Sequence, residues 1–307
     1  MGLWMQTKIA VLGAGAVGCY YGGMLARAGN PVTLVGRPVH IEPILREGLM
    51  LETASFRGHL AVHAAVDPCV IQGAQLVLCC VKSADTEAAA RQMAPYLDKS
   101  SLVLSLQNGV DNARRLQALL PCPVATAAVY VAAEMAGPGH VLHHGRGELI
   151  IGREPGGERI AVVFRAAGIA VEISDNVEGA LWGKLTVNCA YNALSAITRL
   201  PYGRLVAGMG MEDAMRGVVA ECLAVAQAEG VTVPGITWEF VRAIADAMPA
   251  QYSSTAQDLA RGKRSEIEHL NGYVAQRGRA LGVPVAANAL LFAIVRQLEQ
   301  REGTAGA

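Results

Sequence analysis

The sequence predicts an α/β protein whose N-terminal part is a Rossmann-type parallel sheet and whose C-terminal part is an all-helical domain. Three observations predict it: a glycine-rich turn near the start, alternation of short apolar runs with helical stretches in the first half, and loss of strand signal after about residue 174. The 307 residues are enough for two domains. We therefore expect a dinucleotide-binding domain over 1–174 and a helical substrate-binding domain over 175–307.

Apolar runs and helical spacing place the individual elements. Strands are expected at Lys8–Leu12, Pro31–Val35, Leu76–Val81, Leu102–Leu106, Val124–Val131, Glu148–Gly152 and Ile169–Ile173. In the second half, helices are expected at Val177–Leu200, Glu212–Gly230, Thr237–Ala247 and Thr255–Leu281. Prolines between these ranges punctuate the helices, so the second half is expected to be a bundle of separate helices.

The first strand leads into Gly13, Gly15 and Gly18, which have the G-x-G-x-x-G spacing. The three glycines suit a tight turn, a close approach of backbone to a pyrophosphate, and close helix–strand packing. At the start of the following helix, Ala16 and Val17 would offer backbone N–H groups and the positive end of the helix dipole to phosphates. Strand, glycines, helix and second strand within 30 residues predict a dinucleotide site.

A membrane segment is the competing interpretation of this stretch. Ile9–Ala26 contains no charged residue, but it barely reaches spanning length and is rich in glycine. No convincing stop-transfer or cleavage pattern follows it. We therefore expect a soluble protein with no membrane association.

The residue after the second strand indicates which dinucleotide is bound. An NAD-type domain would have an acidic residue there to bond the ribose hydroxyls, whereas this chain has Arg37. A guanidinium suits the 2′-phosphate of NADP, so we expect NADPH. The alternative is an ordinary loop arginine.

Composition excludes several other classes of protein. The formal net charge is zero, and no basic run with interleaved aromatic residues is present, so no nucleic-acid partner is expected. The seven cysteines have no C-x-x-C spacing, and an odd number of cysteines in hydrophobic runs indicates reduced thiols, so we expect a cytoplasmic protein. The seven histidines have no metal-ligand spacing. No metal is therefore expected. The sequence does not fix the number of subunits, and a homodimer is compatible with it.

Polar residues follow two of the expected strands at the end where open α/β sheets bind ligands. Lys82 comes after the third strand and Asn108 after the fourth. Both would then lie at the sheet edge that carries the glycine turn. Each is also compatible with a simple turn, because Asn-Gly is a common turn pair.

The segment KLTVNCAYN places Lys184, Asn188 and Asn192 at i, i+4 and i+8 of an expected helix. These side chains span about 80° of one helix face. The flanking residues are mostly apolar, and a buried ammonium beside two amides is costly unless each finds a partner. The segment therefore indicates either a ligand site or a hydrogen-bonded ladder between packed helices.

A second polar cluster lies near residue 255. Ser253 has the position of a helix N-cap, and Ser254 follows it. Asp258 and Glu266 are eight residues apart, so on one helix they would share a face. A salt-bridged surface helix would give the same pattern.

Together these motifs resemble the ketopantoate reductase family (2-dehydropantoate 2-reductases) over nearly the whole chain. The matching segments are GAGAVG with Arg37, VKSADT (81–86), QNGV (107–110), LWGKLTVNCAYN (181–192), SSTAQD with SEIEHLNG, and GVPVAAN (282–288). The resemblance implies NADPH-dependent reduction of 2-dehydropantoate to (R)-pantoate, a step of pantothenate and coenzyme A synthesis.

The resemblance also implies roles for individual residues. Lys184 would be the general acid at the keto group, and Glu266 would bind the substrate and help to set the active site. Asn188, Asn192 and Ser254 would hold the substrate. Lys82 and Asn108 would lie near the cofactor and the reaction centre.

Two other functions remain open on the sequence. One is an NADPH-dependent reductase of a different 2-oxo acid, with chemistry like that of the β-hydroxyacid dehydrogenases. The other is a non-catalytic protein that binds NADP as a sensor, which leaves the lysine, the two asparagines and the glutamate unexplained.

Overall fold

The computed structural model describes residues 6–304, with side chains as far as Arg301, and the chain divides into two compact units. Unit 1 is Met1–Val177 and unit 2 is Glu178–Ala307. The uncharged run Ile9–Ala26 is divided between a strand and a helix. Within the described residues, no helix has the length and apolar character needed to cross a membrane.

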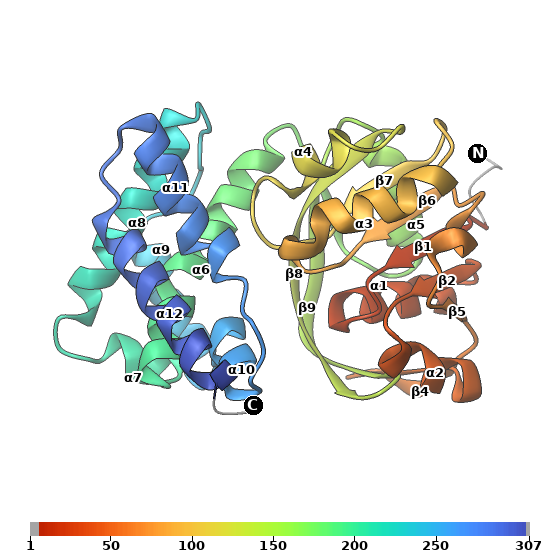
Figure 1. The fold of residues 1–307 in the computed structure, drawn as a ribbon, viewed down its shortest axis with the longest axis horizontal. Helices are drawn as coiled ribbons and strands as arrows, with labels where there is room; N and C mark the ends of the chain where they lie inside the picture. Colours follow the sequence, from red (N-terminus) through yellow and green to blue (C-terminus); the bar gives the residue numbers. More distant parts are fainter. Residues whose placement is uncertain (1–5, 305–307) are drawn as a thin grey trace. The chain divides into compact units, whose positions relative to one another are not determined.

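Unit 1 is built on a ten-stranded sheet with the order β4-β3-β9-β8-β7-β6-β1-β2-β5, in which β10 also pairs with β9 (Figure 1). The strands are β1 (Ile9–Leu12), β2 (Val32–Val35), β3 (Leu49–Thr53), β4 (Phe56–Leu60), β5 (His63–Ala65), β6 (Leu76–Cys79), β7 (Leu102–Ser105), β8 (Val124–Gly137), β9 (His140–Gly152) and β10 (Val171–Ser174). In the part of the sheet with the order β5-β2-β1-β6-β7-β8, all neighbouring strands are parallel. The pairs β8–β9 and β3–β4 are antiparallel.

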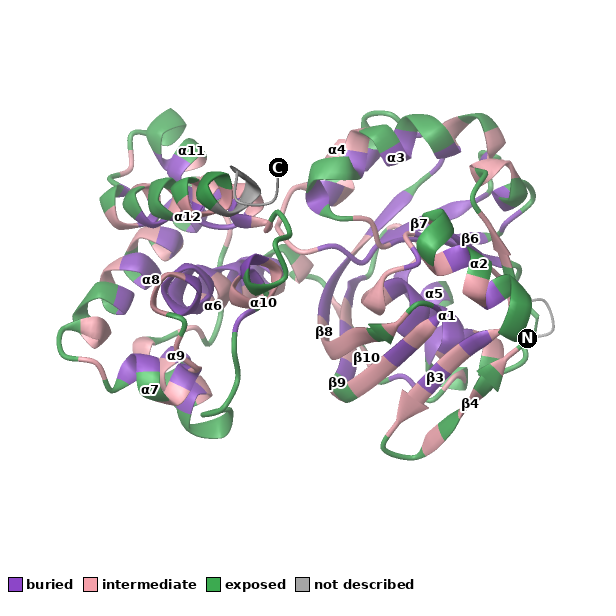
Figure 2. Cartoon of the chain, turned by 60° about the horizontal axis from the view of Figure 1, so that its bottom comes forward, coloured by how far each residue is buried: buried purple, intermediate pink, exposed green. Residues whose placement is uncertain are grey.

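Helices cover both faces of the parallel part, which explains why its strands are continuous apolar runs. Along β1, Ile9 and Val11 enter one core cluster while Ala10 and Leu12 enter another. The first cluster includes side chains from α1 (Ala16–Arg27), α2 (Pro38–Glu47) and α5 (Gly157–Ala166), and the second includes side chains from α3 (Thr86–Met93) and α4 (Asn112–Gln117). Figure 2 shows these strands coloured as buried. Short 3₁₀ turns complete the unit: η1 (Pro68–Ile71), η2 (Ser83–Asp85) and η3 (Ala94–Tyr96).

The predicted fold class is confirmed, although the sheet is mixed rather than wholly parallel. The strand expected at Val124–Val131 continues to Gly137 and returns as β9, so the sheet extends by an antiparallel hairpin. Gly139, with φ +71°, forms the turn between the two strands. Strands β3, β4 and β5 were not predicted from the sequence.

The described residues of unit 2 form helices and the loops that connect them, and no strand. Its elements are α6 (Val177–Thr198), α7 (Tyr202–Val206), α8 (Met211–Ala228), α9 (Trp238–Ala247), α10 (Ser254–Ala260), η4 (Ile267–His269), α11 (Asn271–Leu281) and α12 (Ala286–Thr304), with α6 beginning at the last residue of unit 1. Helix α12 was not predicted.

The expected single helix over Thr255–Leu281 is wrong. Helix α10 ends at Ala260, and Gly262 follows with φ +63°, a conformation that terminates helices and favours glycine. The chain then forms η4 before α11 begins at Asn271. Asp258 and Glu266 therefore do not share a face of one helix.

Helix α6 runs through the core of unit 2 and is buried along most of its length (Figure 2). Trp182 is 2% exposed and packs against the ring of Tyr273. Tyr191 is fully buried, lies 4.4 Å from the ring of Tyr202, and donates a 2.8 Å hydrogen bond to the carbonyl of Val241. These contacts fix the rotation of α6 about its axis, and with it the direction of its polar side chains.

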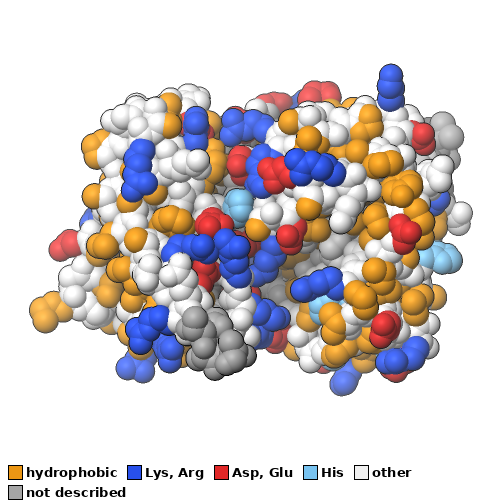
Figure 3. Space-filling model, viewed as in Figure 1, with side chains coloured by type: hydrophobic (Ala, Val, Ile, Leu, Met, Phe, Trp, Pro, Cys, Tyr) orange, Lys and Arg blue, Asp and Glu red, His pale blue; other side chains and the backbone are white. Residues whose placement is uncertain are grey.

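On the face shown in Figure 3, basic and acidic side chains are interleaved, and no large area of this face carries charges of one sign only. The seven cysteines are free thiols. Burial raises the pKa of Cys19 and of Cys79 to about 12, so both stay protonated at neutral pH.

Helices α3 and α4 are joined by a two-point ion pair. Arg115 Nε donates to Glu87 Oε1 and Nη2 donates to Oε2, both at 2.7 Å. The hydrogen bond from Arg115 lowers the pKa of the Glu87 carboxyl from its usual value to about 2. A carboxyl whose pKa falls on folding stabilises the native state above its unfolded pKa of about 4.5, and this contribution is lost as the pH falls toward 2.

We expect Glu87→Gln to lower the free energy of unfolding by about 0.5–1 kcal/mol at neutral pH, because the pair is partly exposed. The difference from wild type should shrink between pH 4.5 and pH 2, as measured by urea unfolding. Glu158→Gln serves as the control, since Glu158 pairs with Arg153 where both side chains are about half exposed or more. An equal loss of unfolding free energy in both variants would show that the ion pair between α3 and α4 stabilises the protein no more than an ordinary surface ion pair.

Candidate active site

The glycine turn has the mechanics expected from its sequence. Gly13 has φ +108°, and a Cβ there would lie 2.7 Å from the carbonyl carbon of Cys80. A Cβ on Gly18 would lie 2.1 Å from the carbonyl oxygen of Gly13. At Gly15, by contrast, a Cβ would meet no atom of the described residues within 4 Å. The first and third glycines are therefore needed for packing, while the second borders open space.

Helix α1 begins directly after this open position. Gly15 is its N-cap residue, and the first turn contains no acidic side chain. The N–H groups of Ala16, Val17 and Gly18 are in the first turn, where helix geometry provides no intrahelical acceptor. Together with the helix dipole, they form a surface suited to a phosphate group.

The parallel register brings four strand ends to the same level. Leu12 pairs with Val35 and with Cys79, and Cys79 pairs with Ser105. The residues that follow these positions include Gly13, Arg37, Lys82 and Asn108, so the unit 1 residues singled out in the sequence occupy one edge of the sheet.

Arg37 is exposed at the start of α2, next to Gly36, whose Cβ would lie 2.7 Å from that of Ala14. Its guanidinium forms no ion pair within the described part of the chain. The loop thus presents a cation beside the glycine turn.

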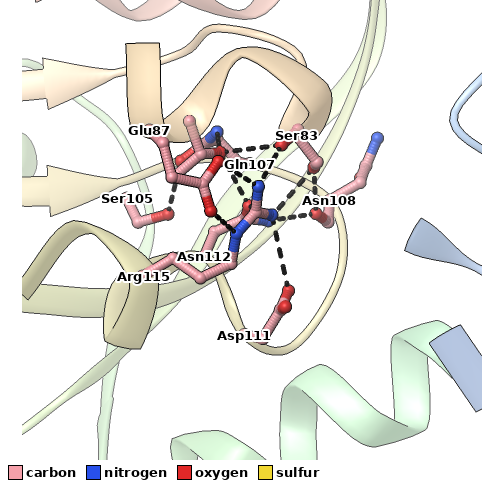
Figure 4. Close-up of polar contacts among 9 residues, drawn as sticks. Ser83, Glu87, Ser105, Gln107, Asn108, Asp111, Asn112 and Arg115 are labelled. Atoms are coloured by element: carbon pink, nitrogen blue, oxygen red, sulfur yellow. Dashed lines mark hydrogen bonds and ion pairs between the residues drawn. The ribbon is translucent and has the colours of Figure 1, made fainter. Parts of the chain in front are cut away.

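Lys82 is exposed and Asn108 is half-buried. The structure adds five residues to which the sequence analysis gave no role. They join the loops that carry these two side chains, and we call them the loop cluster: Ser83, Thr86, Gln107, Asn112 and Arg115. Figure 4 labels all of them except Thr86. All except Arg115 are buried. Their signal in the sequence was the polar character of the segments KSADT after β6 and QNGVDN after β7.

In unit 2, α6 carries Lys184, Asn188 and Asn192, of which the first two are half-buried and the third is buried. Asn192 Nδ2 donates to Ser254 Oγ at 3.3 Å, so the structure brings these two predicted residues together. Ser253 caps α10 by accepting from the N–H of Ala256, as predicted, and also donates to the carbonyl of Asn192 at 3.1 Å. This hydroxyl therefore sets the position of Ser254 against α6.

Glu266 lies half-buried just before η4, on the segment that separates α10 from α11. Its carboxylate comes from a part of unit 2 different from the helix that carries Lys184. The hydrogen bonds that join Asn192, Ser253 and Ser254 do not include it.

Buried amides hold the middle of α6 in place. Asn271, fully buried, donates to the carbonyl of Cys189 and to Asn288 Oδ1. Asn288 in turn donates to Glu221, whose two oxygens also accept from the N–H groups of Ala287 and Asn288 at the start of α12. Asn271 of the NG segment and Asn288 of the GVPVAAN segment therefore have a structural role. They hold the backbone of α6 at Cys189, the residue after Asn188.

Taken chemically, unit 1 offers an anion-binding helix terminus with a cation beside it, and unit 2 offers an ammonium, amides and a hydroxyl. Such groups can bind a polar small molecule and stabilise negative charge on an oxygen. In the described ranges, no three His, Cys, Asp or Glu side chains are grouped so that they could hold a metal ion.

Comparison with known proteins assigns both units to one family. The family model described as ketopantoate reductase PanE/ApbA matches residues 9–156, and the model of its C-terminal part matches residues 176–299. The chain is 34% identical to the 2-dehydropantoate 2-reductase of Halobacterium salinarum, over 96% of this chain and 100% of that one.

Solved structures agree. A PanE/ApbA family ketopantoate reductase from Ralstonia eutropha JMP134 superposes with a TM-score of 0.94 at 62% identity, covering 96% of this chain and 99% of the other. A D-mandelate dehydrogenase in complex with NADH and anilino(oxo)acetate superposes with a TM-score of 0.89 over 96% and 99% of the two chains, but at 23% identity it shows the fold alone. The chain is an oxidoreductase that belongs to the ketopantoate reductase family.

Proposed function

We propose that this protein reduces 2-dehydropantoate to (R)-pantoate with NADPH, a step in the synthesis of pantothenate and hence of coenzyme A. One observation carries the proposal. Lys184, Asn188 and Asn192 occupy one face of the buried helix α6, and Asn192 is hydrogen-bonded to Ser254, in a chain of this family. A lysine next to amides and a hydroxyl is suited to a substrate with a keto group and hydroxyls.

The residues of unit 1 fit a dinucleotide phosphate. The open space at Gly15 permits close approach to the backbone, and Ala16, Val17 and Gly18 would donate to the pyrophosphate. Arg37 would pair with the 2′-phosphate, which supports NADPH over NADH. Lys82 and Asn108, at the same sheet edge, would contact the cofactor. When bound, the cofactor supplies a hydride to the keto carbon.

The remaining chemistry falls to side chains of unit 2. Hydride addition leaves negative charge on the former keto oxygen, and Lys184 would stabilise this charge and donate a proton to it. One such donor typically contributes roughly 3–4 kcal/mol to stabilisation of the transition state. Asn188, Asn192 and Ser254 would orient the substrate, and Glu266 would accept a hydrogen bond from its hydroxyl.

The direct test is oxidation of NADPH, followed by absorbance, with ketopantoate and a panel of branched and unbranched 2-oxo acids. We expect the highest kcat/KM for ketopantoate, because polar groups built to bond its hydroxyl are left unpaired by analogues that lack it. A clear preference for another 2-oxo acid would identify a different reductase. Tight NADPH binding without turnover of any acid would indicate a non-catalytic sensor.

We expect Lys184→Ala to lower kcat by about two orders of magnitude or more, since it removes both the charge and the proton donor at the keto oxygen. The Kd for NADPH, measured by fluorescence, should change little. Lys99→Ala, which alters an exposed lysine of unit 1, is the control and should retain full turnover. Equal kcat in the Lys184 variant and wild type would remove this lysine from the mechanism.

Cofactor choice tests Arg37 separately. Arg37→Ala should raise the KM for NADPH about tenfold or more and leave the KM for NADH nearly unchanged, because only NADPH has the 2′-phosphate. Arg46→Ala, an exposed arginine in the last turn of α2, is the matched control. If wild-type enzyme used NADH as well as NADPH, the role given to Arg37 would be refuted.

A further inference from the structure

Ser83 lies at the centre of the loop cluster and is fully buried. Its hydroxyl donates a 2.8 Å hydrogen bond to the carbonyl of Asn108 and accepts a 3.1 Å hydrogen bond from Asn112 Nδ2. Its own carbonyl accepts from Arg115 Nη2 at 2.9 Å. One side chain thus joins the loop after β6 to the loop after β7 and to the start of α4.

The carbonyl of Asn108 receives two donors, Ser83 Oγ and Asn112 Nδ2, the latter at 2.6 Å. Two hydrogen bonds on one carbonyl fix the plane of the peptide that joins Asn108 to Gly109. Gly109, with φ +96°, lets the chain turn immediately afterwards. The direction in which the side chain of Asn108 points from the backbone is therefore set partly by the loop that carries Ser83.

Asn112 and Thr86 complete the connection behind Ser83. Asn112 Oδ1 accepts from Arg115 Nη1 at 3.0 Å and lies 2.9 Å from the hydroxyl of Thr86, which in turn accepts from Gln107 Nε2 at 2.8 Å. Figure 4 shows Gln107, Asn112 and Arg115 converging on the loop of Ser83. The backbone on both sides of the two loops is tied to the same few polar atoms.

Such a network is costly to bury, since each polar atom must keep a partner once it leaves water. At the amino ends of the same two strands, Ser101 Oγ donates to the carbonyl of Ala74 at 2.8 Å and joins β7 to the chain before β6. The carboxyl ends carry a far more elaborate connection. Joining two strands does not require it, whereas holding two side chains at fixed positions does.

We propose that Ser83 is a positioning residue, which holds the side chains of Lys82 and Asn108 at fixed positions relative to each other so that both can contact the dinucleotide. The inference rests on the proposed function, because it takes these two side chains as cofactor contacts. Ser83 touches neither ligand nor reacting atom in this role. It acts through the backbone of its neighbour Lys82 and through the carbonyl of Asn108.

The test compares Ser83→Ala with Ser101→Ala in the full-length protein. Each variant loses one buried hydroxyl and a 2.8 Å hydrogen bond between the chain segments at one end of the same two strands, and Ser83→Ala also loses the 3.1 Å hydrogen bond from Asn112. Ser101→Ala should lower Tm by an amount on the order of 2–4 °C, and Ser83→Ala by somewhat more because of the second lost hydrogen bond. Only Ser83→Ala should weaken NADPH binding, by about tenfold, and lower kcat, whereas Ser101→Ala should stay within about twofold of wild type.

Hydrogen exchange gives a readout that needs neither cofactor nor substrate. In Ser83→Ala, peptides covering residues 82–86 and 107–112 should both exchange faster, and Ser101→Ala should leave them unchanged. If Ser83→Ala does not fold, Arg115→Lys loosens the backbone that carries Ser83, because it keeps the charge beside Glu87 and loses the fork that reaches the carbonyl of Ser83. The same two peptides should then exchange faster and NADPH affinity should fall.

Equal kcat and equal NADPH affinity in Ser83→Ala and Ser101→Ala would overturn the positioning role, as would unchanged exchange of the 107–112 peptide. Failure of the proposed function has a different signature. Wild-type protein would then reduce none of the 2-oxo acids, while the exchange comparison would still decide whether Ser83 couples the two loops.

Discussion

The structure of unit 1 depends on the contact between the start of α1 and the ends of β1 and β6. Gly18 and Gly13 have no room for a side chain, because the backbone of one lies against the carbonyl of the other and against Cys80. This contact lets α1 leave the sheet with its N-terminus directly over the strand ends. Every residue proposed to bind the dinucleotide is placed relative to that point by the parallel register.

Unit 2 places its polar side chains in a different way. Helix α6 is held by Tyr191 and Trp182 through apolar contacts, and by Asn271 through a hydrogen bond to its backbone. Apolar packing fixes the position of the whole helix, whereas the hydrogen bond from Asn271 fixes its backbone at Cys189. Lys184 and Asn188 thereby gain a defined direction from neighbours that do not take part in the proposed chemistry.

Much of this arrangement could be predicted from the sequence, where the signal is local. The glycine spacing, the apolar strands and the i, i+4, i+8 polar face each follow from the period of a helix or strand, and the capping role of Ser253 follows from its side chain. What the sequence did not reveal depends on tertiary contacts. Strands β3 to β5 are only partly apolar, and their pairing is what makes them strands. The loop cluster likewise depends on partners distant in the chain. The helix break at Gly262 had a local signal, the glycine itself, which the sequence analysis did not use. The roles of the individual site residues stay predictions.

The tight packing at the glycine turn also has a bearing on how ligand preference can change in this protein. At positions 13, 18 and 36 an added Cβ would lie within 3 Å of backbone or of Ala14, so a larger residue there requires neighbouring atoms to shift. Position 37 is exposed and unconstrained by packing. Under the role proposed for Arg37, nucleotide preference is set at an exposed loop position, where a substitution leaves the packed glycine turn beneath it undisturbed.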